Sequence, residues 1–187
     1  MNILITGCNG QLGTELRLQE VSHATHRFFN TDVEELDITD QMAVDTFVAK
    51  NQIDGIINCA AFTAVDKAET SKERCTALNT VAPAYLASAI ERRGGWMIHI
   101  STDYVFQGDI ALPCREDWPV HPNGVYGATK LQGEQAVQEA GCSWQIFRTA
   151  WLYSPYGKNF VKTMRNLTAE RPALKVVFDQ VGTPTYA

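Results

Sequence analysis

The sequence has no long apolar run, no excess of basic residues and no paired-cysteine motif, and each absence excludes a class of protein. No apolar stretch reaches the ~18 residues of a membrane span, so we expect no membrane partner. Met1–Gly7 lacks the basic and apolar regions of a signal peptide and instead predicts a buried strand. The formal net charge of −5 argues against nucleic acid and anionic lipid as partners.

The cysteines and histidines form no recognisable ligand set. Five cysteines are present, an odd number with wide spacing and no C-x-x-C, which predicts reduced thiols in a cytoplasmic protein. His23 and His26 could meet on one helical turn, but the sequence around them predicts a loop followed by a strand. Because metal sites need more ligands than this pair supplies, we predict no metal site.

Strand-like and helix-like segments alternate along the 187 residues, a length that suits one domain. Such alternation predicts an α/β fold, a doubly wound parallel sheet with helices on both faces. The predicted strands are Ile3–Thr6, Arg27–Thr31, Gly55–Asn58, Trp96–Ser101, Trp144–Arg148 and Leu174–Phe178. The predicted helices are Gln11–Glu20, Gln41–Asn51, Lys72–Arg92, Tyr126–Ala140 and Asn159–Glu170.

Two segments interrupt this alternation. The stretch from Thr102 to Gly124 contains three prolines and predicts a long loop, and loops of that length in compact domains are often functional. Residues 179–187 predict neither a closing helix nor a closing strand. We therefore expect a fold that continues beyond this chain.

A glycine-rich motif lies between the first predicted strand and the first predicted helix. Residues Gly7–Gly13 read G-x-x-G-x-x-G. Glycines in this context permit a tight turn and close approach to a pyrophosphate, and the helix N-terminus supplies free N–H groups with a positive dipole end. The motif predicts dinucleotide binding, and the alternative is a strand-to-helix turn without a ligand.

Asp32 follows the second predicted strand, where a carboxylate usually bonds the ribose 2′-hydroxyl and disfavours a 2′-phosphate. This position favours NAD(H). A solvated acidic loop is the alternative, because other carboxylates follow within a few residues. Asp37 and Ile38 suit a contact on the adenine side. The preference between NADH and NADPH therefore stays open at this point.

Three side chains indicate carbonyl chemistry. Tyr126 and Lys130 form Y-x-x-x-K, and helix positions i and i+4 share a face. The Lys130 ammonium would then lower the pKa of Tyr126 and favour its phenolate. Thr102 lies at the carboxyl end of a predicted strand, where open parallel sheets place their active sites. Alone, Y-x-x-x-K usually marks an exposed helix face and Thr102 a turn, but here the elements agree.

These segments together resemble the dTDP-4-dehydrorhamnose reductase family, which belongs to the extended short-chain dehydrogenases. The resemblance extends over nearly the whole chain. It rests on the glycine loop, Ala60–Glu69, Ser101–Phe106, Tyr126–Lys130 and Arg148–Trp151. The stretches Ala64–Glu69 and Ser101–Phe106 are its most specific parts, whereas the wider superfamily shares the glycine loop and Y-x-x-x-K.

The resemblance implies an NAD(P)-binding Rossmann domain over residues 1–187, with the smaller C-terminal substrate domain largely missing. It implies reduction of the 4-keto group of dTDP-4-dehydro-L-rhamnose to dTDP-L-rhamnose, a precursor of cell-surface polysaccharide. The implied cofactor is NADPH, with NADH possible. The implied partners are a dTDP-sugar substrate and, in the full-length protein, a second copy of the chain.

The resemblance also implies roles for individual residues. Tyr126 would donate the proton, Lys130 would tune Tyr126 and hold the ribose, and Thr102 would orient the carbonyl. The residues implied to contact the cofactor are Gly7, Gly10, Gln11, Leu12, Gly13, Asp32, Asp37, Ile38, Ala61, Phe62, Thr63, Tyr126 and Lys130. Those implied to contact the sugar nucleotide are Thr102, Asp103 and Trp151. The family often has histidine where Phe62 stands, so we expect no polar role there.

Two other functions fit parts of the pattern. One is a different nucleotide-sugar reductase or epimerase, against which the Val65–Glu69 segment argues. The other is an NADP-binding regulator similar to the regulatory subunit of methionine adenosyltransferase, which could keep the glycine loop without turning over a sugar. The complete set of Thr102, Tyr126 and Lys130 favours the enzyme.

Overall fold

A computed structural model describes residues 1–109 and 112–187, so Ile110 and Ala111, inside the predicted long loop, lie outside the described residues. The strands are β1 (Asn2–Thr6), β2 (Arg27–Thr31), β3 (Gly55–Asn58), β4 (Trp96–Thr102), β5 (Ser143–Thr149), β6 (Leu152–Tyr153) and β7 (Thr185–Tyr186). The longer helices are α1 (Gln11–Gln19), α2 (Gln41–Lys50), α5 (Ala82–Glu91), α6 (Val125–Glu139) and α7 (Phe160–Glu170). The short helical segments are α3 (Val65–Ala68), α4 (Lys72–Thr76), η1 (Glu20–His23), η2 (Ala77–Val81) and η3 (Asp103–Val105).

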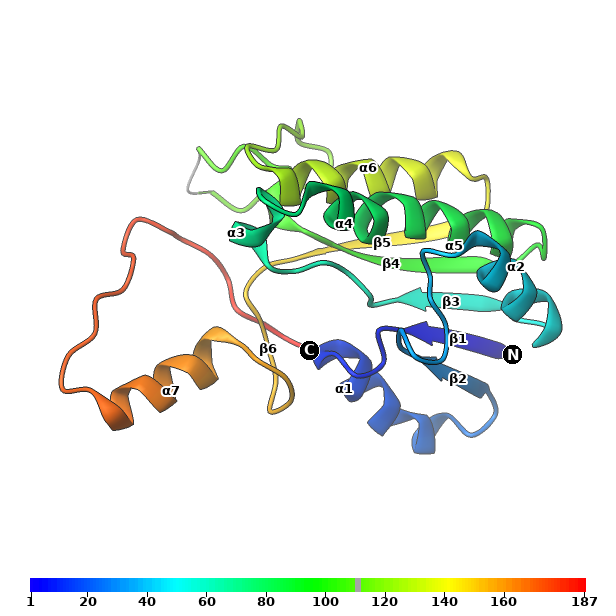
Figure 1. Cartoon of the computed structure of the whole chain (residues 1–187), viewed down its shortest axis with the longest axis horizontal. Coiled ribbons are helices and arrows are strands. Elements are labelled where there is room, and N and C mark those ends of the chain that lie inside the picture. Colours follow the sequence, from blue (N-terminus) through cyan, green and yellow to red (C-terminus); the bar gives the residue numbers. More distant parts are fainter. Residues whose placement is uncertain (110–111) are drawn as a thin grey trace.

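The central sheet confirms the predicted parallel α/β fold. Its strand order is β2-β1-β3-β4-β5, and every neighbouring pair is parallel. The chain moves outward from β1 to β2 and then crosses to the opposite side of β1 at β3. Since parallel crossovers are right-handed, this reversal places α1 on one face and the following helices on the other (Figure 1). Ligands of such sheets bind where the strand order reverses.

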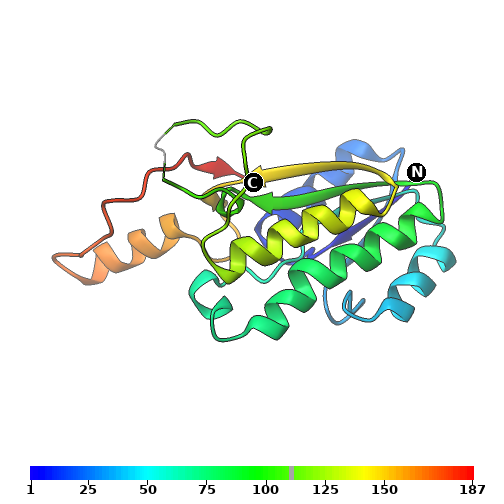
Figure 2. The same ribbon diagram turned by 90° about the horizontal axis from the view of Figure 1, so that it is seen from above.

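Three helices cover one face of the sheet and enclose the core. Helices α2, α5 and α6 lie side by side against the strands (Figure 2). Leu4, Ile56 and Met97 from three adjacent strands are fully buried, as are Leu86 and Ile90 of α5. Complete burial of each such side chain contributes roughly 1.5–3 kcal/mol. This rigid layer holds the carboxyl ends of the strands in place.

The predicted helix Lys72–Arg92 divides into three parts in the structure. Residues Ala77–Val81 form one π-helical turn between α4 and α5. Pro83 lies just after this turn and lacks the N–H that an α-helix would direct to the carbonyl of Asn79. The π-helical turn is wider than an α-helical turn and accommodates the missing hydrogen bond without breaking the helix. The turn also presents the buried side chain of Asn79 to a neighbouring loop.

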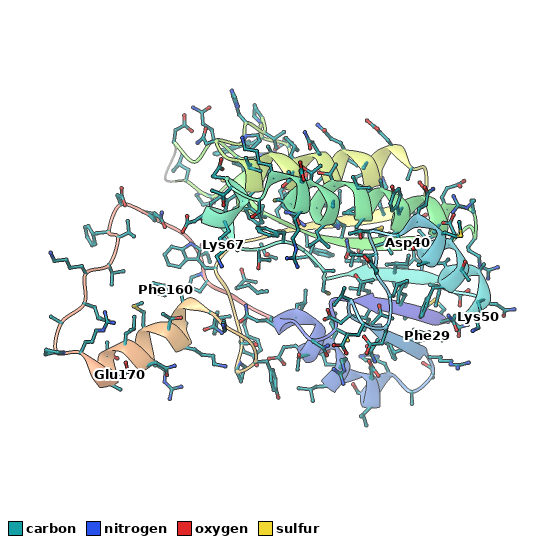
Figure 3. All side chains as sticks on the ribbon, in the orientation of Figure 1. Phe29, Asp40, Lys50, Lys67, Phe160 and Glu170 are labelled. Atoms are coloured by element: carbon teal, nitrogen blue, oxygen red, sulfur yellow. The ribbon has the colours of Figure 1, made fainter. Side chains whose placement is uncertain are left out.

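Two predictions near the C-terminus are wrong. Leu174–Phe178 forms no strand, since the segment has no strand to pair with in the described chain and Phe178 is 98% exposed. Thr185–Tyr186 does form a short strand, β7, which pairs with β6 in parallel. Helix α7 contains no buried residue and extends away from the sheet, as Phe160 and Glu170 show (Figure 3). In residues 1–109 and 112–187, no helix is both long and apolar enough to cross a membrane.

Candidate active site

A cleft of about 950 Å³ opens at the carboxyl edge of the sheet. Each of the five long strands contributes residues at or just after its end, namely Thr6, Thr31, Cys59, Thr102 and Thr149. The cleft gathers nearly all the site residues predicted from the sequence, listed here in chain order: Gly7, Gly10, Gln11, Leu12, Gly13, Asp32, Asp37, Ile38, Ala61, Thr63, Thr102, Asp103, Tyr126, Lys130 and Trp151. Phe62 does not line it.

The glycine loop is packed so tightly that side chains would not fit. Gly7 has a φ of +64°, and a Cβ there would lie 2.7 Å from the backbone nitrogen of Ala60. A Cβ on Gly13 would lie 2.4 Å from the carbonyl oxygen of Gly7. No side chain caps the start of α1 at Gly10. The loop therefore presents backbone N–H groups at the end of a helix to whatever enters the cleft.

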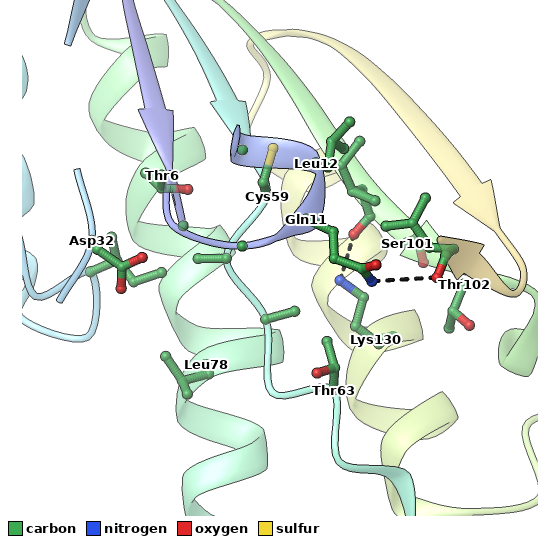
Figure 4. Close-up of a pocket in the computed structure, with 18 of the residues that line it drawn as sticks. Thr6, Gln11, Leu12, Asp32, Cys59, Thr63, Leu78, Ser101, Thr102 and Lys130 are labelled. Atoms are coloured by element: carbon green, nitrogen blue, oxygen red, sulfur yellow. Dashed lines mark hydrogen bonds between the residues drawn. The ribbon is translucent and has the colours of Figure 1, made fainter. Parts of the chain in front are cut away.

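Asp32 lies across the cleft from Thr102 and Lys130 (Figure 4). Its carboxylate accepts hydrogen bonds from the backbone N–H of Asn9 at 3.2 Å and of Val33 at 2.9 Å. These bonds hold the negative charge at the end of β2. Asp37 bonds the hydroxyl and the N–H of Thr39, and both bonds lower its pKa. The acidic side chains are thus fixed structural features of the cleft.

Tyr126 and Thr102 meet at the opposite end of the cleft. Thr102 ends β4 and accepts a hydrogen bond from the N–H of Tyr104, whose ring packs edge-on against Tyr126 with ring centroids 5.6 Å apart. Burial raises the pKa of Tyr126 to about 12, and Asp103 adds to the rise, while hydrogen bonding with Thr102 opposes it. Tyr126 is therefore protonated near neutral pH.

Lys130 lies one turn after Tyr126 on α6 and is 1% exposed. Its Nζ donates to the carbonyl oxygen of Ile100 at 2.6 Å and lies 3.4 Å from Nε2 of His99. Burial lowers the pKa of Lys130 to about 8. The prediction that Lys130 lowers the pKa of Tyr126 is not met in this structure, because Lys130 is bonded to β4.

Glu69 caps the helix that carries Tyr126, a role that the sequence did not reveal. Its Oε1 accepts from the backbone N–H of Val125 at 2.8 Å, and Gly124 at the start of α6 offers no capping side chain. A Cβ on Gly124 would lie 3.0 Å from the same oxygen. A carboxylate at a helix N-terminus is favoured by both hydrogen bonding and the helix dipole. The segment around Glu69 therefore positions Tyr126.

Asn79 fixes the backbone of Phe62. Its side chain accepts from the N–H of Phe62 at 2.8 Å and donates to the carbonyl of Phe62 at 3.1 Å. This pair of bonds, made by a residue of the π-helical turn, anchors the loop that carries Ala61 and Thr63. The ring of Phe62 remains outside the cleft lining, so this residue contributes through its backbone.

Two cationic side chains and one distorted residue complete the lining. Arg74 and Lys158 reach the cleft from α4 and from the segment after β6, and neither was predicted. Trp151, which was predicted from the sequence, has a φ of +49° and is 47% exposed. Positive φ in a bulky residue is uncommon and concentrates at functional sites. Burial raises the pKa of Asp103 at the same end of the cleft.

The chain matches known proteins over its whole length. The family model described as "RmlD substrate binding domain" matches residues 1–187. The dTDP-4-dehydrorhamnose reductase of Burkholderia thailandensis is 41% identical over 100% of this chain and 62% of its own length. A probable dTDP-4,6-dihydroxy-2-methyloxan-3-one 4-ketoreductase of Streptomyces antibioticus is 43% identical over 100% of this chain and 63% of its own.

A solved structure agrees with both the sequence match and the fold. The crystal structure of dTDP-4-dehydrorhamnose reductase from Bacillus anthracis, in complex with NADP, superposes with a TM-score of 0.95 at 42% identity. It is matched over 99% of this chain and 66% of that structure. The chain thus spans slightly under two thirds of these relatives, and it belongs to the RmlD substrate-binding domain family.

Proposed function

We propose that this chain is the NAD(P)-binding and catalytic part, residues 1–187, of an enzyme that reduces the 4-keto group of dTDP-4-dehydro-L-rhamnose. The observation that carries this proposal is the meeting of Thr102, Tyr126 and Lys130 in one cleft with the glycine loop. The proposed cofactor is NADPH, as in the Bacillus anthracis relative, whose structure contains NADP. Asp32, at the end of β2, suits the free ribose 2′-hydroxyl of NADH as well.

The residues present fit a dinucleotide. A Cβ on Gly7 would collide with the backbone of Ala60, and one on Gly13 with the backbone of Gly7 and Cys8, so the tight turn that a pyrophosphate-binding loop needs requires glycine at both positions. The uncapped start of α1 supplies N–H donors for the pyrophosphate. At the other end, Ser101 Oγ is buried without a hydrogen-bond partner in the described part of the chain and belongs to the cleft lining. When bound there, a reduced nicotinamide supplies the hydride for a ketone carbon.

Side chains of the protein donate the proton to the ketone oxygen and orient that oxygen. Tyr126 is protonated near neutral pH, so its hydroxyl can give a proton to the ketone oxygen as the carbon accepts the hydride. Thr102, at the end of β4, bonds the same oxygen and orients it. Lys130, whose Nζ is bonded to Ile100 in the structure, is assigned to the ribose of the cofactor. The product is the alcohol, with one new C–H bond and one new O–H bond.

The sugar-nucleotide end of the substrate is assigned to Asp103 and Trp151. Reduction of another dTDP-4-keto sugar is the second candidate, favoured by the 43% identity to the Streptomyces antibioticus protein. The regulatory alternative predicts binding of NADPH without turnover. A comparison of keto sugars in the full-length protein, followed through loss of NADPH absorbance, separates all three functions.

Removal of the Tyr126 hydroxyl tests its assignment as the proton donor. Tyr126→Phe in the full-length protein removes the proton donor and leaves the cofactor contacts of the glycine loop intact. We expect turnover to fall by about 10²–10⁴-fold with the affinity for NADPH nearly unchanged. Tyr85→Phe, on the core side of α5, is the matched control and should keep turnover. Near-normal turnover in Tyr126→Phe would refute the proposed mechanism.

The remaining expectations concern the whole protein. We propose that it works in the cytoplasm, in agreement with the five cysteines, none of which forms a disulfide in the described chain. The homodimer implied by the resemblance is likewise a proposal. Light scattering on the full-length protein measures the mass in solution and tests it directly.

A further inference from the structure

A chain of buried polar side chains connects the glycine loop to Lys130. Thr6 Oγ1 donates to Asn58 Oδ1 at 2.7 Å, and Asn58 Nδ2 lies 3.1 Å from His99 Nδ1. His99 Nε2 then lies 3.4 Å from Lys130 Nζ. All four residues are at most 1% exposed. Polar groups buried to this degree retain their partners, because losing one costs about 1–3 kcal/mol.

The backbone of Ala60 fixes the orientation of this chain. Its N–H donates to Asn58 Oδ1 at 3.2 Å. A flipped amide would place the Asn58 NH₂ group against that N–H, so Oδ1 must face Ala60 and Nδ2 must face His99. An amide NH₂ group only donates, and Nδ1 of His99 must therefore accept. The ring proton of neutral His99 is then on Nε2, which points to Lys130.

Lys130 consequently faces a hydrogen-bond donor, the Nε2–H of His99, instead of an anionic side chain. Glu134, one turn along α6, is committed to Arg148 through bonds of 2.6 and 3.0 Å. The other ionisable groups near Lys130 are Cys59 after β3 and Cys75 of α4. Burial keeps Cys59 protonated by raising its pKa to about 12. A buried lysine normally has an anionic partner, and this one bonds a neutral carbonyl and faces an N–H.

We propose that His99, oriented by Asn58, is a positioning residue that directs its Nε2–H at Lys130 Nζ and favours the uncharged amine in the absence of ligand. In the uncharged form of Lys130, the amine lone pair accepts this N–H while one amine hydrogen donates to Ile100. Burial lowers the pKa of His99 well below its ordinary value, so the ring is neutral. His99 thereby helps to set the pH at which Lys130 loses its charge, and the effect on cofactor affinity rests on the proposed function.

The tautomer of His99 tests the geometry without any ligand. Two-dimensional ¹⁵N NMR of histidine-labelled full chain distinguishes a protonated ring nitrogen from an unprotonated one. The His99 signals are those that disappear in His99→Phe. We expect a proton on Nε2 and none on Nδ1 near pH 7. A proton on Nδ1, or an imidazolium ring, overturns the proposal whether or not the protein binds NADPH.

Two variants test the consequence for Lys130. His99→Phe deletes the N–H, and Asn58→Asp forces the proton to Nδ1 so that Nε2 accepts from Lys130. In wild type, the affinity for NADPH should fall above about pH 8, where Lys130 loses its charge. We expect the pH at which the affinity for NADPH decreases to be higher by about one unit or more in either variant. His23→Phe, at an exposed position, is the control and should not move it.

The outcomes separate the two proposals. An unchanged pH dependence in both folded variants overturns the role of His99. Absence of NADPH binding in the wild-type protein contradicts the proposed function, and the NMR tautomer then decides the inference alone. If one variant fails to fold, the other still reports the shift, because they act on the same hydrogen bond from opposite sides of the ring.

Discussion

Two ionisable side chains in the cleft have pKa values that burial shifts in opposite directions. The pKa of Tyr126 rises to about 12 and that of Lys130 falls to about 8. Tyr126 therefore keeps its proton across the physiological range, as a proton donor should. Lys130 lies close to its point of titration. The burial that prepares the chemistry also weakens the fold, because the Lys130 ammonium lacks a dedicated counter-ion.

Lys130→Met should stabilise the folded chain at pH 7 while abolishing turnover. A pKa lowered from 10.5 to about 8 amounts to roughly 3 kcal/mol at ~1.4 kcal/mol per pH unit. Between these values the unfolded chain binds more protons, so wild-type stability rises with pH across the window. Below about pH 8 the cost is fully present. Denaturant unfolding at pH 7 and pH 10 measures the difference between the two proteins.

The gain in the Lys130→Met variant should shrink as the pH rises toward 10.5, because above that pH the wild-type lysine becomes neutral in the unfolded state as well as in the folded one. A variant that is less stable than wild type at pH 7 would contradict the unpaired-lysine interpretation. A gain that does not change with pH would contradict it as well. The exchange of a buried charge for a methionine of similar length keeps the packing of the side-chain stem.

Asp32→Asn should shift the cofactor preference toward NADPH. The carboxylate, held by Asn9 and Val33, repels a 2′-phosphate, and asparagine removes the charge but keeps the shape. We expect the ratio of the affinities for NADPH and NADH to rise about tenfold, or ~1.4 kcal/mol. Fluorescence titration with both cofactors measures it. Glu34→Gln, outside the cleft lining, should leave the ratio unchanged, and an unchanged ratio in Asp32→Asn would place the adenosine ribose elsewhere.

At the scale of elements, local sequence patterns predicted most of the helices and strands but did not reveal the contacts between distant segments. The apolar runs of β1, β3 and β4 are recognisable because buried parallel strands are apolar on both faces. The same reasoning failed for Leu174–Phe178, whose apolar run has no neighbouring strand in the described chain. Pro83 was visible in the sequence, but the π-helical turn that accommodates it depends on the packing of α4 and α5.

The site divides in the same way. The residues within the glycine loop, and those within the Tyr126–Lys130 pair, are close in sequence, so each motif can be recognised from its spacing and from the strand or helix predicted around it. Glu69 contacts Val125 across 56 positions, and Asn79 contacts Phe62 across 17. Such contacts depend on strand order and helix register, which no local pattern encodes. His99 was hidden because it lies inside a strand, where a buried histidine has no distinctive spacing.

Glu69→Ala should loosen the start of α6. Loss of a helix cap costs about 1 kcal/mol, and the first turn of this helix carries Tyr126. We expect a comparable loss of unfolding free energy together with a fall in kcat that exceeds the change in KM. Glu69→Gln retains an acceptor oxygen and should recover most of both. Equal loss in the alanine and glutamine variants would contradict a capping role.

Arg148→Met should be strongly destabilising. Arg148 pairs with Glu134, whose side chain is 2% exposed, and removal of one partner from such a pair costs about 3–5 kcal/mol. Arg115→Met removes an exposed pair with Asp117 and should cost under about 1 kcal/mol. Adding Glu134→Leu to Arg148→Met should restore much of the stability. Urea unfolding compares the variants, and equal effects of the two arginine substitutions would contradict the argument.

At the scale of the whole molecule, the order of the strands brings the parts of the site together. The reversal between β1 and β3 places the glycine loop in the middle of the carboxyl edge, with Asp32 on one side of it. Thr102 of β4 and Lys130 of α6 lie on the other side (Figure 4). In the proposed complex, a dinucleotide bound across this edge would reach Tyr126 with its nicotinamide end. The relative from Burkholderia thailandensis is longer than this chain, which matches 62% of its length.

The central claim is that this cleft reduces a dTDP-4-keto sugar, and turnover in the full-length protein tests it most directly. The protein is mixed with NADPH and dTDP-4-dehydro-L-rhamnose, the absorbance of NADPH is followed, and the sugar product is identified by NMR. We predict consumption of NADPH that depends on the keto sugar, equals the formation of dTDP-L-rhamnose and is lost in Tyr126→Phe. Tight binding of NADPH with no oxidation in the presence of the keto sugar would contradict the claim.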